Sequence, residues 1–299
     1  MPCQYGYKGT GGFPVLRCFR MNPQVKQPDS DPVVEPSRMG SLDQWTLIAA
    51  VNDDQVLQKT LLASPAIDGR CQVITKRGFP SAGKAYNAGI AEARHEILVF
   101  AHQDIYMPWD WVTKIDSALA YLAMTDPEWG VIGLVGVGHR PDEEVKGHCY
   151  STGLQRFVGK PFSTPAEVRS LDEIVLIIRR SSGLTFDEDL PGFHFYGTDI
   201  CLQAERRKMK SYVACAFCIH NTNGIKRFPL NFWHGYLYMQ QKWWHELPVR
   251  TSCTTLTKWC KPMVSTVASE FLHRVFRPPV VGSRCDDVGG LYQRLIHNT

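Results

Sequence analysis

Short apolar runs that end abruptly in polar residues constrain the fold of this chain more than any other feature of its sequence. Trp45–Val51 (WTLIAAV) ends in Asn52-Asp53-Asp54, and residues 96–101 (EILVFA) end in His102-Gln103-Asp104. Both runs are apolar along their length, as are the strands of a parallel sheet covered on both faces. Because ligands bind beyond the C-terminal ends of such strands, the two polar clusters are predicted to lie at a binding site.

Helical segments are predicted between these runs. Ser81 is a residue type that caps helices, and Ala85, Ile90 and Ala93 would lie along the buried face of the helix that follows it. Further strands are predicted at residues 71–75, 130–137, 173–179 and 212–219, and further helices at residues 54–63, 109–123 and 198–208. This alternation predicts an α/β fold with a mostly parallel central sheet flanked by helices.

Composition divides the chain into three parts. Residues 1–43 are rich in Pro, Gly, Gln and Asp without a sustained hydrophobic period, which predicts an extended or partly ordered leader. Residues 44–250 carry the alternating pattern and are predicted to form one domain, in which residues 138–170 are irregular and placed to cover a site. Residues 251–299 are predicted to be a C-terminal extension that packs on this domain.

Charge and cysteine content exclude several classes of protein. The chain has 33 Lys and Arg against 29 Asp and Glu, which gives a formal charge of +4. This charge is too weak to indicate nucleic-acid binding, because a protein that binds nucleic acid more often has a clustered basic face. The ten cysteines are scattered over 299 residues, so most are predicted to be buried free thiols in a reducing compartment such as the cytoplasm. We find neither a signal-peptide pattern nor a run of about 18 apolar residues that would span a membrane. Peripheral membrane contact and oligomerisation stay open.

Asp104 is the first candidate site residue. A carboxylate at the end of a buried strand and before Pro108 is predicted to lie in the crevice rather than in the core. Hard divalent cations take oxygen ligands and often complete their coordination with substrate phosphates, and a diphosphate leaving group needs such charge neutralisation. The alternative is that Asp104 only caps the turn.

His220 is the second candidate, at the end of the strand predicted over residues 212–219 and before the polar residues 221–224. A lone histidine is more often structural than a ligand, although an imidazole suits Mn²⁺ better than Mg²⁺. Cys215 and Cys218 form a C-x-x-C pair just before it. Because no second pair of Cys or His stands at zinc spacing, these thiols are predicted to belong to the strand core rather than to a structural zinc site.

Asp199 is the third candidate, within the segment GFHFYGTDICLQAERRKMK. A carboxylate at the start of a helix caps backbone N–H groups, and the basic residues 206–210 suit the C-terminal end of the same helix. The alternative is a general base that removes a proton from an acceptor hydroxyl. Asp187 and Glu188 are a weaker pair of candidates for glycosidase chemistry, since adjacent residues rarely face each other across a sugar.

Several segments form a specific combination: AYNAGI, an apolar strand ending in HQD, FDE, FYGTDICLQA before a strand that ends in His, and KWWHELPV. With this combination the chain resembles the family 2-like glycosyltransferases, and especially the branch related to the streptomycin-biosynthesis glycosyltransferase-like proteins. The resemblance spans roughly residues 45–250, while the G-x-x-x-x-G-K-[ST], H-E-x-x-H and G-x-S-x-G motifs are missing from the sequence.

The resemblance implies a GT-A fold over residues 44–250 that binds a nucleotide-diphosphate sugar beside its first strands. The D-x-D metal motif of the family corresponds to His102-Gln103-Asp104, in which His replaces the first Asp, so metal binding is expected to rest on Asp104 and His220. The residues that the resemblance places around the nucleotide and its phosphates are Val51, Asn52, Asp53, Lys84, Asn87, His102, Gln103 and Asp104.

The resemblance also implies a reaction. A hexosyl group would pass from a UDP-, GDP- or dTDP-sugar to a hydroxyl of a glycan or other acceptor, with Mn²⁺ or Mg²⁺, with Asp199 as the base and with inversion at the anomeric carbon. Two alternatives stay open. A nucleotidyltransferase would need a Gly-rich phosphate loop, which VNDDQ lacks, and the imperfect D-x-D also fits a nucleotide-sugar-binding protein without activity.

Overall fold

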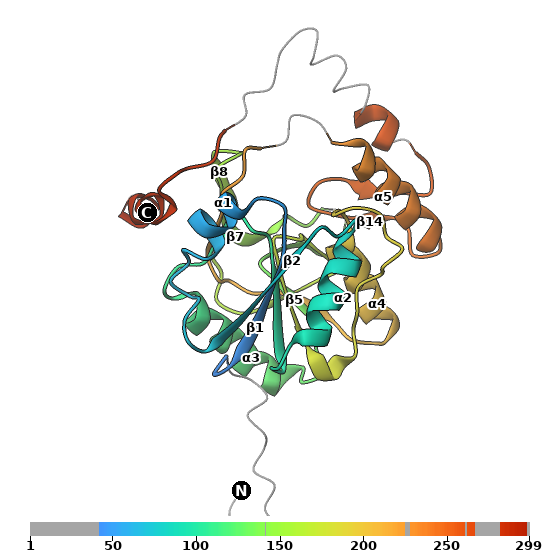
Figure 1. Cartoon of the computed structure of the whole chain (residues 1–299). Helices are drawn as coiled ribbons and strands as arrows, with labels where there is room; N and C mark the ends of the chain where they lie inside the picture. The colour runs from blue at the N-terminus through green and yellow to red at the C-terminus, as the bar shows by residue number, and fades with distance from the viewer. Residues whose placement is uncertain (1–41, 141, 225–227, 261, 267–281, 298–299) are drawn as a thin grey trace, which may run out of the picture. The chain divides into compact units, whose positions relative to one another are not determined.

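The computed structural model of the chain describes residues 42–140, 142–224, 228–260, 262–266 and 282–297 (Figure 1). The chain divides between Ser37 and Arg38 into two units, and all described residues belong to the second. A seven-stranded sheet forms the centre of this unit. Its strands are β1 (Trp45–Val51), β2 (Cys71–Arg77), β3 (Ile97–Ala101), β5 (Val131–Gly133), β9 (Ala166–Val168), β11 (Val175–Arg179) and β12 (Ser211–Val213).

The strands of the central sheet follow the order β2-β1-β3-β11-β5-β12-β9. β1 pairs in parallel with β2 and β3, and β12 pairs in parallel with β5, whereas β11 and β9 run antiparallel to their neighbours. The predicted α/β fold with a mostly parallel sheet is therefore confirmed. The sequence gives no sign that β11 is reversed, because a strand buried on both faces is apolar along its length in either direction.

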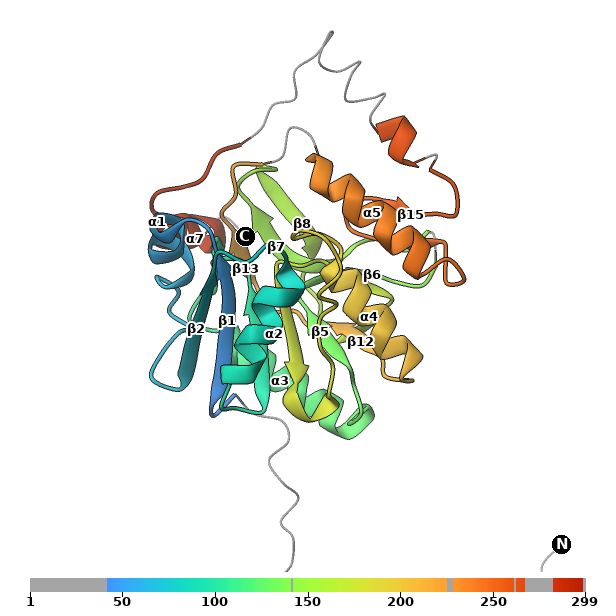
Figure 2. The ribbon, with the colours of Figure 1, turned by 45° about the vertical axis from the view of Figure 1, so that its right-hand side comes forward.

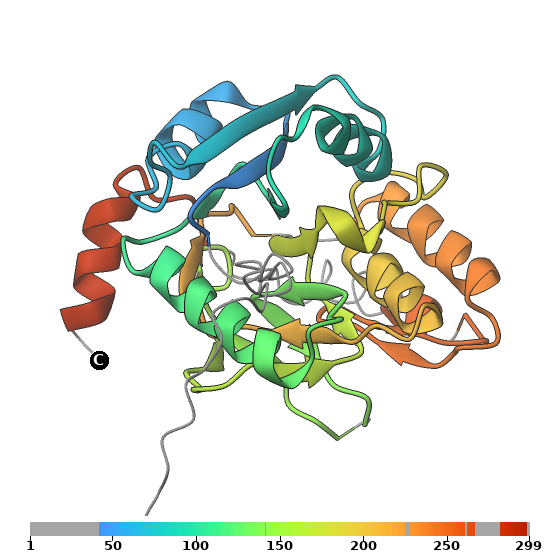
Figure 3. The same cartoon turned by 90° about the horizontal axis from the view of Figure 1, so that it is seen from below.

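Helices cover both faces of this sheet. α3 (Trp111–Thr125) lies on one side, and α2 (Ala82–Glu92) and α4 (Tyr196–Arg206) lie on the other (Figure 3). Alternate residues of β3 show the two layers, since Val99 packs in the core that contains α3 while Phe100 packs in the core that contains α2 and α4. α5 (Leu230–Lys242) adds its aromatic residues to this second core.

A second, six-stranded sheet lies beside the first, and the sequence does not predict it (Figure 2). The prediction of one strand over residues 130–137 is wrong, because the run is divided at Leu134 between β5 of the central sheet and a strand of the second sheet. The second sheet has the order β10-β6-β7-β13-β4, with β8 paired to β7. Its strands are β4 (Ile105–Tyr106), β6 (Val135–Val137), β7 (Lys146–Ser151), β8 (Arg156–Lys160), β10 (Ser170–Leu171) and β13 (Cys218–His220).

The prediction that residues 138–170 are irregular is also wrong. This segment contains the β7–β8 hairpin, β9, and the start of β10. β7 has the sequence KGHCYS, in which buried and half-buried residues alternate as in a strand with one covered face. Its buried positions are Gly147, Cys149 and Ser151 rather than large aliphatic residues, so the hydrophobic signal of a strand is weak.

α4 begins at Tyr196, with Phe195 as its N-cap residue in the left-handed region at φ 66°. The interpretation of Asp199 as the residue that starts this helix is therefore wrong, because Asp199 already lies within the first turns. The Phe195 side chain does not cap the helix, and Glu173 lies nearby, where backbone groups of Phe195 and Gly197 act to lower its pKa. Burial and the neighbouring Asp172 raise the pKa of Glu173 to about 8.

The other predicted helices form with small changes. Asp53 caps α1 (Asp54–Val56), which continues as a π-helical turn η1 (Leu57–Leu61), and Ser81 caps α2 as predicted. η2 (Arg180–Ser182) is a short turn after β11.

The described residues beyond the predicted boundary at residue 250 belong to the same unit. β14 (Val249–Arg250) pairs with β15 (Thr255–Leu256) across that boundary, and β15 contacts α5 (Figure 2). α7 (Val288–His297) packs its Val288 and Tyr292 against Tyr106 and Ile219 of the second sheet.

Eight cysteines lie among the described residues and all are free thiols, whereas Cys3 and Cys18 lie outside them. Cys149, Cys201 and Cys218 are buried and the others are half-buried or exposed, so the prediction that most cysteines are buried is wrong for this part of the chain. Within the described residues, no helix combines the length and apolar character that crossing a membrane requires.

The predicted leader, residues 1–43, lies outside the described residues except for Leu42 and Asp43. Leu42 is fully buried, and its N–H donates to Oδ1 of Asp116 at 2.5 Å. We therefore expect a chain that begins at Arg38 to melt at the temperature of the full chain and to bind the same ligands. A chain that begins at Asp43 should lose about 2 kcal/mol of folding free energy with the Leu42 side chain. Thermal melts followed by circular dichroism test both chains, and a low melting temperature for the Arg38 chain would show that the leader stabilises the fold.

Candidate functional site

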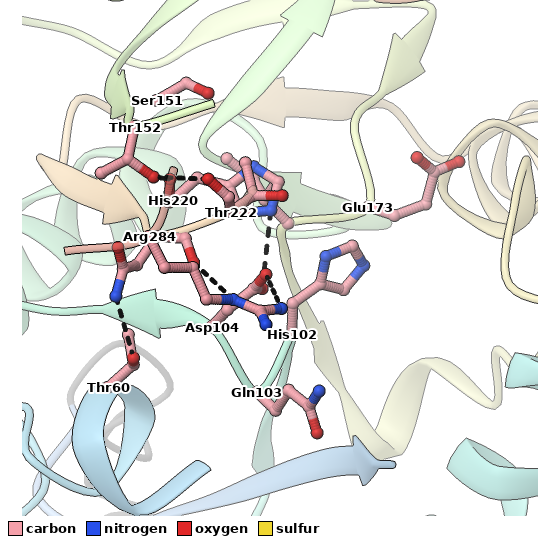
Figure 4. A network of polar contacts seen from close by, with 12 residues as sticks. Thr60, His102, Gln103, Asp104, Ser151, Thr152, Glu173, His220, Thr222 and Arg284 are labelled. Carbon is pink, nitrogen blue, oxygen red and sulfur yellow. Dashed lines mark hydrogen bonds and ion pairs between the residues drawn. The ribbon is translucent and has the colours of Figure 1, made fainter. Parts of the chain in front are cut away.

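His102, Asp104 and His220 meet at the ends of three strands (Figure 4). His102 follows β3, Asp104 precedes β4 and His220 is the last residue of β13. β13 pairs antiparallel with β4, which places His220 opposite Ile105, and the backbone N–H of Asn221 donates to the carbonyl of Asp104 at 2.8 Å. One ligand atom from each of the three side chains lies within 4.8 Å of the others. The structure thus brings the two predicted metal ligands together and adds His102 to them.

The hydroxyl of Tyr196 has three polar neighbours that bear on the tautomer of His102. It lies 3.1 Å from the carbonyl oxygen of Glu173, 2.9 Å from Nε2 of His102 and 3.3 Å from the hydroxyl of Tyr86. In the arrangement in which Tyr196 donates to Glu173, it accepts from Nε2 of His102, and Nδ1 keeps the lone pair with which a neutral histidine binds a metal.

Electrostatics make Asp104 and His220 a charged pair. Burial alone would raise the pKa of Asp104, but His220, His102 and Arg284 together hold that pKa below its ordinary value. Burial alone would lower the pKa of His220, but the Asp104 carboxylate, with Oδ1 3.5 Å from Nε2, raises that pKa to about 9. The pKa of His102 is lowered, chiefly by burial. At neutral pH His102 is therefore neutral while His220 carries a proton.

A metal ion bound to this cluster must displace the proton from His220. The proton is bound below the folded-state pKa of about 9, so we expect the affinity for Mn²⁺ to rise about tenfold for each pH unit between pH 6 and pH 8. Because burial lowers the pKa of His102, His220 supplies most of this dependence. Calorimetric titration of Mn²⁺ at several pH values measures this dependence, and an affinity that does not change with pH would contradict the assignment of His220 as a ligand.

Arg284 and Asn221 make polar contacts beside the cluster. Nη2 of Arg284 lies 3.6 Å from Oδ2 of Asp104, and its Nε donates to the carbonyl of Asn221 at 3.1 Å. The Asn221 side chain, 2% exposed, bonds to both backbone groups of Cys285 and to the hydroxyl of Thr60. Sequence reasoning missed Arg284 altogether, because it is remote in sequence from every strand end that points to the site.

Gln103 connects the two polar clusters that the sequence places at strand ends. Its side-chain oxygen accepts from the backbone N–H groups of Asn52 at 3.0 Å and Asp53 at 3.1 Å, and its amide nitrogen donates to the side chain of Asn52 at 2.5 Å. Asn52 and Asp53 are exposed, and Gln103, which stands between His102 and Asp104 in the sequence, connects them to the His102-Asp104-His220 cluster. One carboxylate oxygen of Asp53 is used to cap α1.

The other residues that the resemblance places at the nucleotide have different surroundings. Val51 is 6% exposed and packs in the core that contains α3. Lys84 is exposed in the first turn of α2. Asn87 bonds through both side-chain atoms to the backbone of Phe186 and also to Glu188, so its amide ties the segment after β11 to α2.

Asp199 lies in a buried network between α4 and α5. Its Oδ1 accepts from Nζ of Lys242 at 2.6 Å and from Nε1 of Trp243 at 2.7 Å, and its Oδ2 accepts from Nε2 of Gln203 at 2.7 Å. The side chain of Asp199 is 1% exposed. Lys242 also donates to Asp187 at 2.6 Å, so it joins two carboxylates. Both oxygens of Asp199 are thus already hydrogen-bonded.

Asp172 is a carboxylate nearer to the metal cluster. It follows β10 and is half-buried, and it accepts from the backbone of Ile174 and the hydroxyl of Ser252. Burial and the Asp104 charge have larger effects on the pKa values of His102 and His220, and the charge of Asp172 also acts to raise both. Asp172 directly precedes the strand predicted at residues 173–179, and the sequence offers it, with Asp187 and Glu188, only as a base to consider if Asp199 is structural.

A separate cavity of about 570 Å³ is lined by residues of α3, β7, β8 and α7, among them Lys114, His148, Phe157 and Tyr292. None of the predicted site residues lines it.

Comparison with known proteins gives a match to one family model. The model of the glycosyltransferase-like family matches residues 46–228, which include β1, β3, β13 and the whole of the His-Asp-His cluster. A curated protein of Fuscovulum blasticum described as "ATP synthase subunits region ORF 6" is 33% identical over 129 residues, which are 42% of this chain and 50% of that protein. The chain therefore spans about half the length of the curated relative it matches.

Two solved structures are similar to part of the chain. The mannosyltransferase PcManGT from Pyrobaculum calidifontis, in complex with GDP-Man and Mn²⁺, has 13% identity and a TM-score of 0.41 over 60% of this chain and 58% of its own. S. aureus TarS has 14% identity and a TM-score of 0.41 over 67% of this chain and 39% of its own. Because these TM-scores and identities are low, we base the assignment to a family on the family model alone.

Proposed function

We propose, on the premise that this chain belongs to the glycosyltransferase-like family, that it transfers a sugar from a nucleotide-diphosphate donor to an acceptor hydroxyl with the help of a divalent cation. The observation that carries this proposal is the His102-Asp104-His220 cluster at the ends of β3 and β13, beside the Asn52-Asp53 loop. In an open α/β sheet this is the edge at which ligands bind.

The donor set of the cluster suits a transition metal. Two imidazoles and one carboxylate favour Mn²⁺ over Mg²⁺, which prefers oxygen ligands in a nearly complete octahedron. Asp104, His102 and His220 would hold the ion, and the Nε2-protonated form of His102 leaves Nδ1 to bind it. When bound, the cation would neutralise charge on the leaving diphosphate.

The donor nucleotide is proposed to lie along the loop after β1. Asn52 and Asp53 are exposed there and are held by Gln103, and Lys84 is exposed at the start of α2. Val51 and Asn87 are proposed to support the nucleotide site indirectly, by fixing nearby backbone. Val51 packs in the core, and Asn87 holds residues 186–188. The donor sugar is proposed to be a hexose.

In the proposed reaction the acceptor oxygen bonds to the anomeric carbon while the bond from that carbon to the diphosphate oxygen breaks. The bonding pair leaves with the diphosphate, and the acceptor proton passes to a base, so the configuration inverts. Asp199 is the base that the resemblance suggests. Asp172 is a second candidate, because it is half-buried and its charge acts on the pKa of His102, whereas the side chain of Asp199 is only 1% exposed.

The acceptor is proposed to be a glycan or another hydroxyl compound, and the reaction to take place in the cytoplasm. The free state of the eight described cysteines agrees with a reducing compartment. Nothing in the charge of the chain, +4 over 299 residues, favours nucleic acid as an acceptor.

A thermal-shift screen of UDP-, GDP- and dTDP-sugars with and without Mn²⁺ tests the proposal. A donor at 100 times its dissociation constant should raise the free energy of unfolding by about 2.7 kcal/mol, and this gain should depend on Mn²⁺. Release of nucleoside diphosphate from the donor then separates an enzyme from an inactive sugar-nucleotide-binding protein. Release of pyrophosphate from a nucleoside triphosphate would indicate a nucleotidyltransferase instead, and the failure of every nucleotide to stabilise the protein would overturn the proposal.

A further inference from the structure

The described C-terminal segment from Gly282 to Asp287 runs across the ends of the second sheet beside the metal cluster. The N–H of Gly282 donates to the carbonyl of Gly153 at 3.0 Å, and a Cβ at residue 282 would lie 1.9 Å from the carbonyl oxygen of Thr152. Cys285 exchanges two hydrogen bonds with the side chain of Asn221, at 2.7 and 2.9 Å. The backbone on both sides of Arg284 is therefore fixed, and only its side chain is free to change partners.

The guanidinium of Arg284 is aimed at the cluster (Figure 4). Nε donates to the carbonyl of Asn221 at 3.1 Å and Nη2 lies 3.6 Å from Oδ2 of Asp104, while 33% of the side chain is exposed. The distance from Nη2 to Oδ2 is longer than a hydrogen bond, so the two groups attract each other without close contact. A guanidinium has five N–H donors, and this geometry leaves donors for an oxyanion that enters from the exposed side.

Asp104 offers separate oxygens to its two basic neighbours. Oδ1 faces Nε2 of His220 at 3.5 Å, whereas Oδ2 faces Arg284. A cation held by the two histidines and Oδ1 would thus leave Arg284 in place beside it. The divalent charge and the guanidinium together outweigh the carboxylates of Asp104 and Asp172, which leaves the site with surplus positive charge. A ligand that carries two neighbouring phosphates matches that surplus.

We propose that Arg284 binds the diphosphate of the donor beside the metal, and exchanges its long ion pair with Asp104 for hydrogen bonds to phosphate oxygens. This proposal rests on the proposed function and deepens it, since it assigns a phosphate-binding residue outside the segment matched by the family model. As the bond from the sugar to the diphosphate breaks, negative charge grows on the leaving oxygen, and a fixed guanidinium stabilises that charge. Arg284 then helps both to hold the donor and to release the leaving group.

Binding measured by calorimetry at saturating Mn²⁺ tests the role of Arg284, with UDP, GDP, inorganic pyrophosphate and the matching nucleosides as probes. Arg284→Gln should weaken the binding of the nucleoside diphosphate and of pyrophosphate about 10- to 100-fold, the range expected for hydrogen bonds to charged groups. The binding of the nucleoside should not change. Arg284→Lys, which keeps the charge but not the fork of donors, should lie between the parent and Arg284→Gln.

Arg294→Gln is the matched control, because Arg294 is an exposed arginine on α7, the helix that follows the segment from Gly282 to Asp287. It should bind every probe as the parent does, and melting temperatures show that each variant folds. If Arg284→Gln binds diphosphates as tightly as the parent and binds Mn²⁺ alone more tightly, Arg284 only neutralises Asp104 and the proposal is overturned. A parent protein that binds neither nucleoside diphosphate would overturn the proposed function together with this one, so the two failures are distinguishable.

Discussion

Replacement of Asp104 by alanine should remove Mn²⁺-dependent nucleotide binding. Asp104 is the only carboxylate in the cluster of His102, Asp104 and His220 that the structure describes, and without it two imidazoles remain. Since loss of a partner that merely orients a metal ligand costs about 10- to 100-fold in affinity, loss of a ligand itself should cost at least about 100-fold. Calorimetric titration of Mn²⁺, and of a nucleoside diphosphate in its presence, measures both effects.

The fold should survive the replacement of Asp104. Its carboxylate is ionised because His220 and Arg284 lie beside it, and in its absence His220 can lose its proton while Arg284 keeps its bond to Asn221. Asp142→Ala is the matched control, because the Asp142 side chain is 82% exposed and its Oδ1 makes only a long ion pair, at 4.0 Å, with Nε of Arg140. It should bind Mn²⁺ as the parent does. A folded Asp104→Ala protein with parental Mn²⁺ affinity would show that the cluster is not the metal site.

The central sheet could be predicted because its signals are local. β1 and β3 are apolar along their length and stop at polar residues, and Ser81 stands one residue before α2 and caps it. The prediction of one strand over residues 212–219 is wrong, because the run is divided between β12 of the central sheet and β13 of the second sheet, so the sequence does not predict that His220 lies at the same edge as Asp104. Their distance from each other does not follow from the sequence either, because it depends on the pairing of β13 with β4, a strand of only two residues.

The parts of the site that could not be predicted depend on contacts between distant segments. Arg284 reaches Asp104 across 180 positions of the chain, through a backbone that Asn221 and Gly153 hold. The second sheet has strands such as β7, whose buried residues are small, and a strand pattern without large apolar residues is weak. The surroundings of Asp199 could not be predicted for the same reason, because its partners Lys242 and Trp243 lie at the C-terminal end of α5.

Asp199→Asn and Asp172→Asn form the pair of variants that identifies the base. Loss of a general base costs roughly 10²- to 10⁴-fold in turnover, and an amide cannot take the proton that a carboxylate accepts. If Asp199 is the base, as the resemblance suggests, Asp199→Asn should show this loss while Asp172→Asn transfers sugar at nearly the parental rate. Donor binding should not change in either variant. Lys242 keeps its bond to Asp187, so Asp199→Asn should still fold.

Disruption of the buried hydrogen-bond network around Asp199 can lower turnover as loss of a base does. A further variant therefore has to disturb the network and keep the carboxylate. Lys242→Met removes the ion pair that Asp199 makes at 2.6 Å without touching Asp199 itself. If Asp199 only holds α5 against α4, Lys242→Met should lower turnover as much as Asp199→Asn does, and both should lower the melting temperature. If Asp199 takes the proton, Asp199→Asn should be the much slower enzyme of the two. Turnover lost in Asp172→Asn instead, with donor affinity and melting temperature unchanged, would move the base to the carboxylate beside His102 and leave Asp199 a structural role.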